Sequence, residues 1–217
     1  RFMQVQQVLN IGCKSSLEQE MNLSFILIGS THSFLDDFSK QKEIISVINP
    51  EFVLSEELEN LELNTEDKFK NILKKKHISN MTSFEEIKEL VDFCFNKRIK
   101  LIGIDFHNFG FNATLQRKIK NQEKLTNEEE KELDRLTMLR EKHHLSKILE
   151  YKEKTTKPLV IILGCWHLRA SSLLRKKLKN YKIIAPLDKN GEVLFEPVEK
   201  EKIKYGEIIS NDTEIKD

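Results

Sequence analysis

The sequence predicts an α/β fold with a mixed, centrally parallel sheet flanked by helices. Short apolar runs of strand length alternate with longer segments of helical spacing, a pattern typical of parallel strands joined by helical crossovers. Two of these runs, at 23–28 and 158–163, are followed by the same Gly-x-x-His pattern, at 29–32 and 164–167. Ligands of open α/β sheets bind beyond the carboxyl ends of the strands. We therefore expect the two histidines to contribute to one shared site.

The individual elements follow from the spacing of apolar residues along the chain. Strands are expected at 23–28, 52–55, 100–104, 158–163 and 181–185. Helices are expected over about 33–48, 66–75, 83–97, 127–151 and 168–178. Ser83 with Glu86 and Thr126 with Glu129 have the spacing of capping boxes, which mark the starts of two of these helices.

A single domain is expected at residues 23–205, because 217 residues are enough to bury a substantial core. Residues 1–22 are interpreted as an N-terminal extension, and residues 206–217 as a polar tail. No internal repeat is visible that would indicate a solenoid or a propeller.

Charge and hydropathy exclude some classes of partner. Lys and Arg number 36 against 35 Asp and Glu, so no excess of positive charge favours nucleic acid as a partner. No apolar run reaches the roughly 18 to 20 residues that a membrane span needs, so we expect a soluble protein. Its three cysteines cannot all pair within one chain and show no Cys-x-x-Cys spacing, which favours a reducing, cytoplasmic setting. The oligomeric state stays open.

Polar side chains follow four of the expected strands. They belong to His32, Glu56, Glu57, Asp105, His107 and His167. Neutral imidazoles with a carboxylate can bind a divalent metal, or one imidazole can act as a general base on water. Glu56 and Glu57 are adjacent, and strand alternation directs only one of them toward the site.

Further candidates lie beside these strand ends and on the long helix. Arg140 borders the helix face predicted to be apolar and could stabilise charge on an attacked carbonyl. That face is expected to consist of Met138, Leu139, Leu145 and Ile148. Gly29 and Gly164 would allow a tight turn and close approach of the substrate. Trp166 is expected as a pocket wall, and His107 as a second substrate-binding residue.

Other reactive residue types have plainer interpretations. His77, His143 and His144 are interpreted as ordinary hydrogen-bonded residues. Adjacent residues of a helix point about 100° apart, so His143 and His144 are not expected to chelate one ion together. Cys165 could be a nucleophile, but a small buried residue at a strand end is the favoured interpretation.

The order of these motifs resembles the TraB/PrgY and Tiki group, which shares a fold with the erythromycin esterases and ChaN-like proteins. The two Gly-x-x-His segments match, and residues 50–58 fit the Pro-x-x-Val-x-x-Glu-like strand of that group. Arg140 and Glu141 fit its late-helix motif less well, because Asn is common where Glu141 stands. The resemblance covers residues 23–185, and the chain lacks the membrane segment of the larger members.

The resemblance implies a site made by the two histidines, a Glu and the Arg. Tiki-like members are considered metal-dependent peptidases, erythromycin esterases cleave a lactone ester without metal, and ChaN-like members bind haem or iron. For this chain it implies a divalent metal such as Mn, Co or Zn held by His32, His167 and Glu57. Glu57 is favoured over Glu56 because the family's acidic residue precedes an apolar one, here Leu58.

Three functions are therefore compared. The leading hypothesis is a soluble TraB/Tiki-like hydrolase that cleaves a peptide or ester bond of a small-molecule or peptide substrate with water activated by His and Glu. The second is a ligand- or metal-binding protein of the same fold without catalysis. The third is an interaction module that uses the charged surface of helix 127–151.

Overall fold

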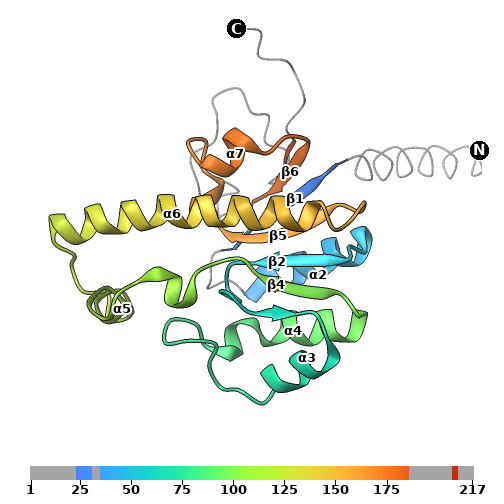
Figure 1. Ribbon diagram of the computed structural model, residues 1–217, viewed down its shortest axis with the longest axis horizontal. Helices are drawn as coiled ribbons and strands as arrows, with labels where there is room; N and C mark the ends of the chain where they lie inside the picture. The colour runs from blue at the N-terminus through green and yellow to red at the C-terminus, as the bar shows by residue number, and fades with distance from the viewer. Residues whose placement is uncertain (1–22, 31–34, 186–206, 210–217) are drawn as a thin grey trace, which may run out of the picture.

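The computed structural model describes residues 23–30, 35–185 and 207–209, and it confirms the predicted α/β class. The sheet has seven strands in the order β3-β4-β2-β5-β1-β6-β7 (Figure 1). Its parallel centre comprises β1 (Phe25–Ser30), β2 (Phe52–Ser55), β4 (Lys100–Gly103), β5 (Leu159–Gly164) and β6 (Tyr181–Ile184). Short antiparallel strands close its two edges, β3 (Glu62–Leu63) beside β4 and β7 (Glu207–Ile209) beside β6.

Helices cover both faces of this sheet. They are α2 (Leu35–Ile48), α3 (Glu66–Ile72), α4 (Phe84–Lys97), α5 (Ala113–Lys120), α6 (Asn127–Lys152) and α7 (Leu173–Lys177), with the 3-10 turns η1 (His107–Gly110) and η2 (Cys165–Leu168). The helices α2, α3 and α4 pack on one face, whereas α6 and α7 pack on the other (Figure 1). The first half of α6 continues past the sheet toward α5. No helix in the described part of the chain combines the length and apolar character needed to cross a membrane.

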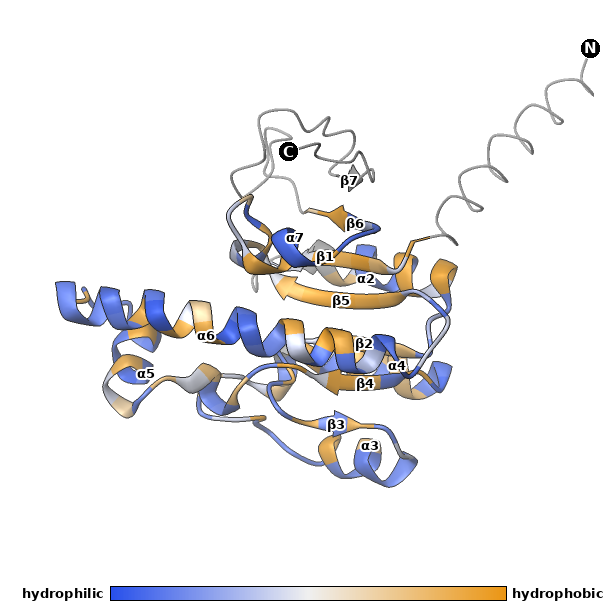
Figure 2. Ribbon diagram, turned by 45° about the horizontal axis from the view of Figure 1, so that its top comes forward, coloured by the Kyte–Doolittle hydropathy of each residue, from blue (hydrophilic) through white to orange (hydrophobic). Residues whose placement is uncertain are grey.

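The core consists of two apolar layers, one on each side of the sheet. Residues of β1 alternate between them, because successive side chains of a strand point to opposite faces. Leu27 joins Ile148 and Tyr151 of α6 in one layer, while Ile26 joins the layer beneath α2 and α4. The strands are therefore apolar on both faces, which explains the continuous hydrophobic runs in the sequence (Figure 2).

Both predicted helix starts have N-caps. Thr126 and Glu129 form the expected capping box at the start of α6. Ser83 caps α4 by accepting a hydrogen bond from the backbone N–H of Glu85. Such caps satisfy backbone donors that have no partner within the first helical turn.

The structure corrects three expectations about local structure. Of the predicted helix over 168–178, only Leu173–Lys177 is α-helical, as the short α7 with Ser172 as its N-cap, and the 3-10 turn η2 ends at Leu168. The predicted polar tail contains β7, which pairs with β6. The predicted apolar face of α6 was wrong at Met138 and Leu139, which are exposed, whereas Ile148 is buried in the core and Leu145 packs against it, as predicted. The buried residues of α6 are Leu136, Glu141, His144, Ile148 and Tyr151.

Candidate metal centre

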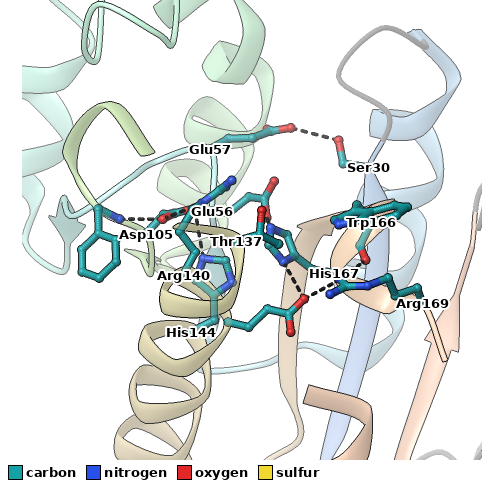
Figure 3. Close-up of polar contacts among 12 residues, drawn as sticks. Ser30, Glu56, Glu57, Asp105, Thr137, Arg140, His144, Trp166, His167 and Arg169 are labelled. Atoms are coloured by element: carbon teal, nitrogen blue, oxygen red, sulfur yellow. Dashed lines mark hydrogen bonds and ion pairs between the residues drawn. The ribbon is translucent and has the colours of Figure 1, made fainter. Parts of the chain in front are cut away.

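A cluster of charged and imidazole side chains lies where the central strands end, between the sheet and α6 (Figure 3). Glu56 follows β2, Asp105 follows β4, and His167 lies in η2 after β5. These strands are parallel neighbours in the order β4-β2-β5, so their carboxyl ends bring the three side chains to one edge. The helix α6 passes over this edge and contributes residues from the other side.

Glu56, His144 and His167 form a buried group whose arrangement could hold a metal ion. One ligand atom of each residue lies within 4.8 Å of the others. The three residues are at most 3% exposed. The two imidazoles meet edge to face, with ring centroids 4.9 Å apart. A carboxylate with two imidazoles is a donor set found in catalytic zinc sites and in other divalent metal sites.

Glu141 holds His167 in the orientation that a metal ligand needs. Its Oε1 lies 3.4 Å from Nδ1 of His167, while Nε2 of the same ring faces Oε2 of Glu56 at 3.6 Å. Glu141 also accepts hydrogen bonds from Arg169 and from the backbone N–H of Leu173. Burial opposes its charge, but these contacts prevail and lower the pKa of Glu141 to about 2. Histidine ligands of metals commonly have such a carboxylate on their second nitrogen.

Asp105 lies beside His144 as Glu141 lies beside His167. Its Oδ2 lies 3.0 Å from Nε2 of His144, and its carboxylate also accepts hydrogen bonds from Nε and Nη2 of Arg140. Burial disfavours the charged form of Asp105, yet His144 and Arg140 outweigh it and hold its pKa below the ordinary value. Asp105 is therefore an ionised group that orients both an imidazole and a guanidinium.

One nitrogen of His144 supports the fit of these residues to a metal. Both of its ring nitrogens are buried and make no hydrogen bond of good geometry among the described residues; Nε2 lies 3.0 Å from Oδ2 of Asp105, which leaves Nδ1 for a metal. A buried polar atom without a partner is costly, and such atoms in native proteins usually have a functional explanation. The donor set, the two carboxylates behind the imidazoles and this nitrogen together fit a divalent cation.

A pocket of about 570 Å³ opens next to the group. Glu56, Arg140 and His167 line it together with Ser30, Glu57, Met81, Thr82, Phe109, Thr137, Gly164, Cys165 and Trp166. Its volume is within the range of small-molecule sites. Two of the candidate metal ligands, Glu56 and His167, therefore border a space of substrate size, whereas His144 does not line it.

The structure brings only part of the predicted site together. Glu56, rather than Glu57, lies in the group with His167, and Glu57 accepts a hydrogen bond from Ser30 Oγ at 2.9 Å. His32 lies outside the described residues. Arg140 lines the pocket as expected.

Only some of the predicted substrate-binding residues line the pocket. Gly164 and Trp166 line the pocket, whereas Gly29 lies in β1 and pairs with Leu163 of β5. His107 is a mostly exposed partner of Glu59. The φ of Gly164 is −55°, which any residue can adopt, so the chain needs no glycine freedom for its turn there.

Sequence reasoning missed His144 and Glu141 as site residues. The available signal was their spacing from Ile148 and Tyr151, because positions 141, 144, 148 and 151 recur at three and four residues on one helix face. Adjacent residues of a helix point about 100° apart, and of His143 and His144 only His144 is in the group. His143 instead stacks on Phe106, with ring centroids 4.4 Å apart.

Comparisons with protein-family models, with curated proteins and with solved structures found no significant match.

Proposed function

We propose that this protein is a metal-dependent hydrolase of the TraB/Tiki type that cleaves a peptide or ester bond. The observation that carries the proposal is the buried group of Glu56, His144 and His167 at the wall of a substrate-sized pocket. Both imidazoles have an acidic residue behind them, as metal-binding histidines commonly do. Mn, Co and Zn are the candidate ions.

Glu56, His144 and His167 would hold the cation, with His32 as a further candidate from the sequence. When bound, a divalent cation supplies Lewis-acid activation, which makes water a nucleophile at neutral pH. Glu141 and Asp105 keep the two imidazoles in a fixed orientation and tautomer. This preorganisation reduces the rearrangement needed when substrate binds.

Arg140 has the role of stabilising negative charge on the attacked carbonyl oxygen. Its guanidinium lies at the pocket wall, where Asp105 binds Nε and Nη2 and leaves Nη1 outside that pair. Burial opposes its charge, but Asp105 and Glu56 raise the pKa of Arg140, so the group stays cationic. A fixed cation near a developing oxyanion is a common source of rate acceleration.

The test combines metal loading with hydrolysis. The purified protein is loaded with Mn²⁺, Co²⁺ or Zn²⁺ in turn and assayed on p-nitrophenyl esters and on a mixture of short peptides. We expect turnover that a chelator removes and the metal restores. His144→Ala should lose this turnover. His143→Ala is its matched control and should hydrolyse the substrates as the wild type does. Metal binding without any turnover would favour the non-catalytic binding protein, and absence of metal binding would refute the proposal.

A further inference from the structure

Glu59 is a buried carboxylate outside the metal group, and it is surrounded by donors from two other loops. Its side chain is 0% exposed. Oε1 accepts hydrogen bonds from the hydroxyls of Ser79 and Thr82, the latter at 3.2 Å. Oε2 accepts one from the backbone N–H of Asn108 at 2.8 Å and lies 3.1 Å from Nδ1 of His107. Glu59 therefore ties the loop before α4 to the η1 turn.

These two loops build one wall of the pocket. Met81 and Thr82 come from the loop before α4, and Phe109 comes from η1. The backbone N–H of Asn80 also donates to Oδ1 of Asn108 at 2.9 Å, which joins the loops directly. The positions of the Met81 and Phe109 side chains therefore depend on contacts made by Glu59.

The backbone at Phe109 is held in an unusual conformation. Asn108 and Phe109 have φ values of 51° and 54°, in the left-handed region. A bulky residue there is strained, and such strain persists only where the surrounding structure maintains it. The hydrogen bond from Asn108 N to Glu59 anchors this turn, and the Phe109 ring lies 4.8 Å from the guanidinium carbon of Arg140. The strained turn thus places an aromatic ring beside the proposed oxyanion-stabilising group.

We propose that Glu59 is a positioning residue that maintains an apolar subsite made by Met81 and Phe109. This subsite selects substrates that carry an apolar chain next to the bond to be cleaved. The inference rests on the proposed function, because it takes the metal group as the place where that bond is held. Met81 and Phe109 line the same pocket as Glu56 and His167, so a ligand held at the metal group shares this space with the two apolar side chains.

The test measures binding, so it does not depend on turnover. Acetohydroxamate and hexanohydroxamate share a metal-binding head and differ by four methylene groups. Each is titrated into the metal-loaded protein by calorimetry. We expect hexanohydroxamate to bind at least about tenfold more tightly, because burying methylene groups is favourable. In Glu59→Gln this ratio should fall below about threefold, because the amide N–H₂ replaces an acceptor that the loops require.

Phe109→Gly provides a second variant that is expected to fold. Glycine adopts a φ of 54° without strain, and the substitution removes the ring. Phe109→Gly should also abolish the tighter binding of hexanohydroxamate relative to acetohydroxamate. Asn180→Gly is the matched control, because Asn180 has a φ of 55° and is not among the pocket residues. This control should keep the wild-type ratio.

The outcomes separate the two proposals. Equal binding of both hydroxamates to the wild-type protein, or an unchanged preference in Phe109→Gly, would overturn the apolar subsite and leave the metal centre intact. If neither hydroxamate binds protein that elemental analysis shows to hold a metal, the subsite inference falls and the metal centre stands. If the treated protein holds no metal, the metal centre is refuted, and the subsite inference falls with it.

Discussion

Glu56 and Glu59 are three residues apart on the chain after β2, and both side chains are buried. The carboxylate of Glu59 is surrounded by hydroxyl, amide and imidazole groups at hydrogen-bonding distance. The carboxylate of Glu56 lies in the group with the imidazoles of His144 and His167, and its Oε2 is 3.6 Å from Nε2 of His167. Burial alone therefore does not assign a role to a carboxylate. The surrounding donors make Glu59 a structural clamp, and the surrounding imidazoles make Glu56 a candidate ligand.

Removing the Glu59 side chain should produce the largest effect on stability. Glu59→Ala leaves the N–H of Asn108 and the hydroxyl of Thr82 buried without their acceptor. We expect the free energy of unfolding to fall by about 3–5 kcal/mol, measured by urea denaturation. Metal affinity should change little in the folded fraction. If stability were unchanged, Glu59 would not clamp the loops.

In Glu56→Gln, by contrast, we expect the main effect on metal affinity rather than on the free energy of unfolding. Metal affinity should fall by more than about 100-fold, since the loss of a direct ligand should exceed the roughly 10- to 100-fold cost of losing an outer-shell partner. The free energy of unfolding should fall less than in Glu59→Ala, because the carboxamide keeps the side-chain volume and removes only the charge that faces His167 and Arg140. Isothermal titration and urea denaturation measure the two quantities. Loss of stability with full metal affinity would remove the distinction between Glu56 and Glu59.

A smaller effect is expected from Glu141, which reaches the metal only through His167. Glu141→Gln should lower metal affinity by roughly 10- to 100-fold, because the imidazole loses its charged partner. The variant should keep the metal stoichiometry of the wild type at saturating concentrations. Unchanged affinity would mean that Glu141 serves only Arg169 and the start of α7.

The backbone around Glu59 offers a final comparison. A Cβ added at Gly103 would lie 2.1 Å from the backbone oxygen of Glu59 and 2.7 Å from that of Leu61. Gly103→Ala should therefore lower the melting temperature, with a cost of about 1–3 kcal/mol. A Cβ added at Gly110 would meet only side-chain atoms, at 3.6 Å or more. Gly110→Ala is therefore the comparison variant without a backbone clash, and its φ of 73° adds a strain of its own. An unaffected Gly103→Ala would show that the Glu59 turn tolerates displacement.

The sheet could be predicted because each central strand is a buried apolar run with a clear end. His167 and Glu56 could be placed at the site edge for the same reason. The choice between Glu56 and Glu57 could not be made from alternation, because β2 ends at Ser55 and the chain then turns. The resemblance favoured Glu57, whereas the structure directs Glu56 toward His167 and Glu57 toward Ser30.

The contribution of α6 was harder to predict because its buried face contains polar residues. Glu141 and His144 interrupt the apolar pattern, so the pattern predicts Met138 and Leu139 for this face, although both are exposed. Polar side chains are buried there because Asp105, Arg169 and His167 on other elements provide their partners. These partners are distant in sequence, and helical periodicity does not report them.

The most direct test of the metal centre compares two adjacent histidines of α6. Wild type, His144→Ala and His143→Ala are saturated with Mn²⁺, Co²⁺ or Zn²⁺, dialysed and examined by elemental analysis. We predict about one ion per chain in the wild type and in His143→Ala, and its loss in His144→Ala, because catalytic zinc sites typically use three protein ligands and this variant removes one of the three that the structure brings together. Retention of the ion in His144→Ala, or no ion in the wild type, would contradict the assignment.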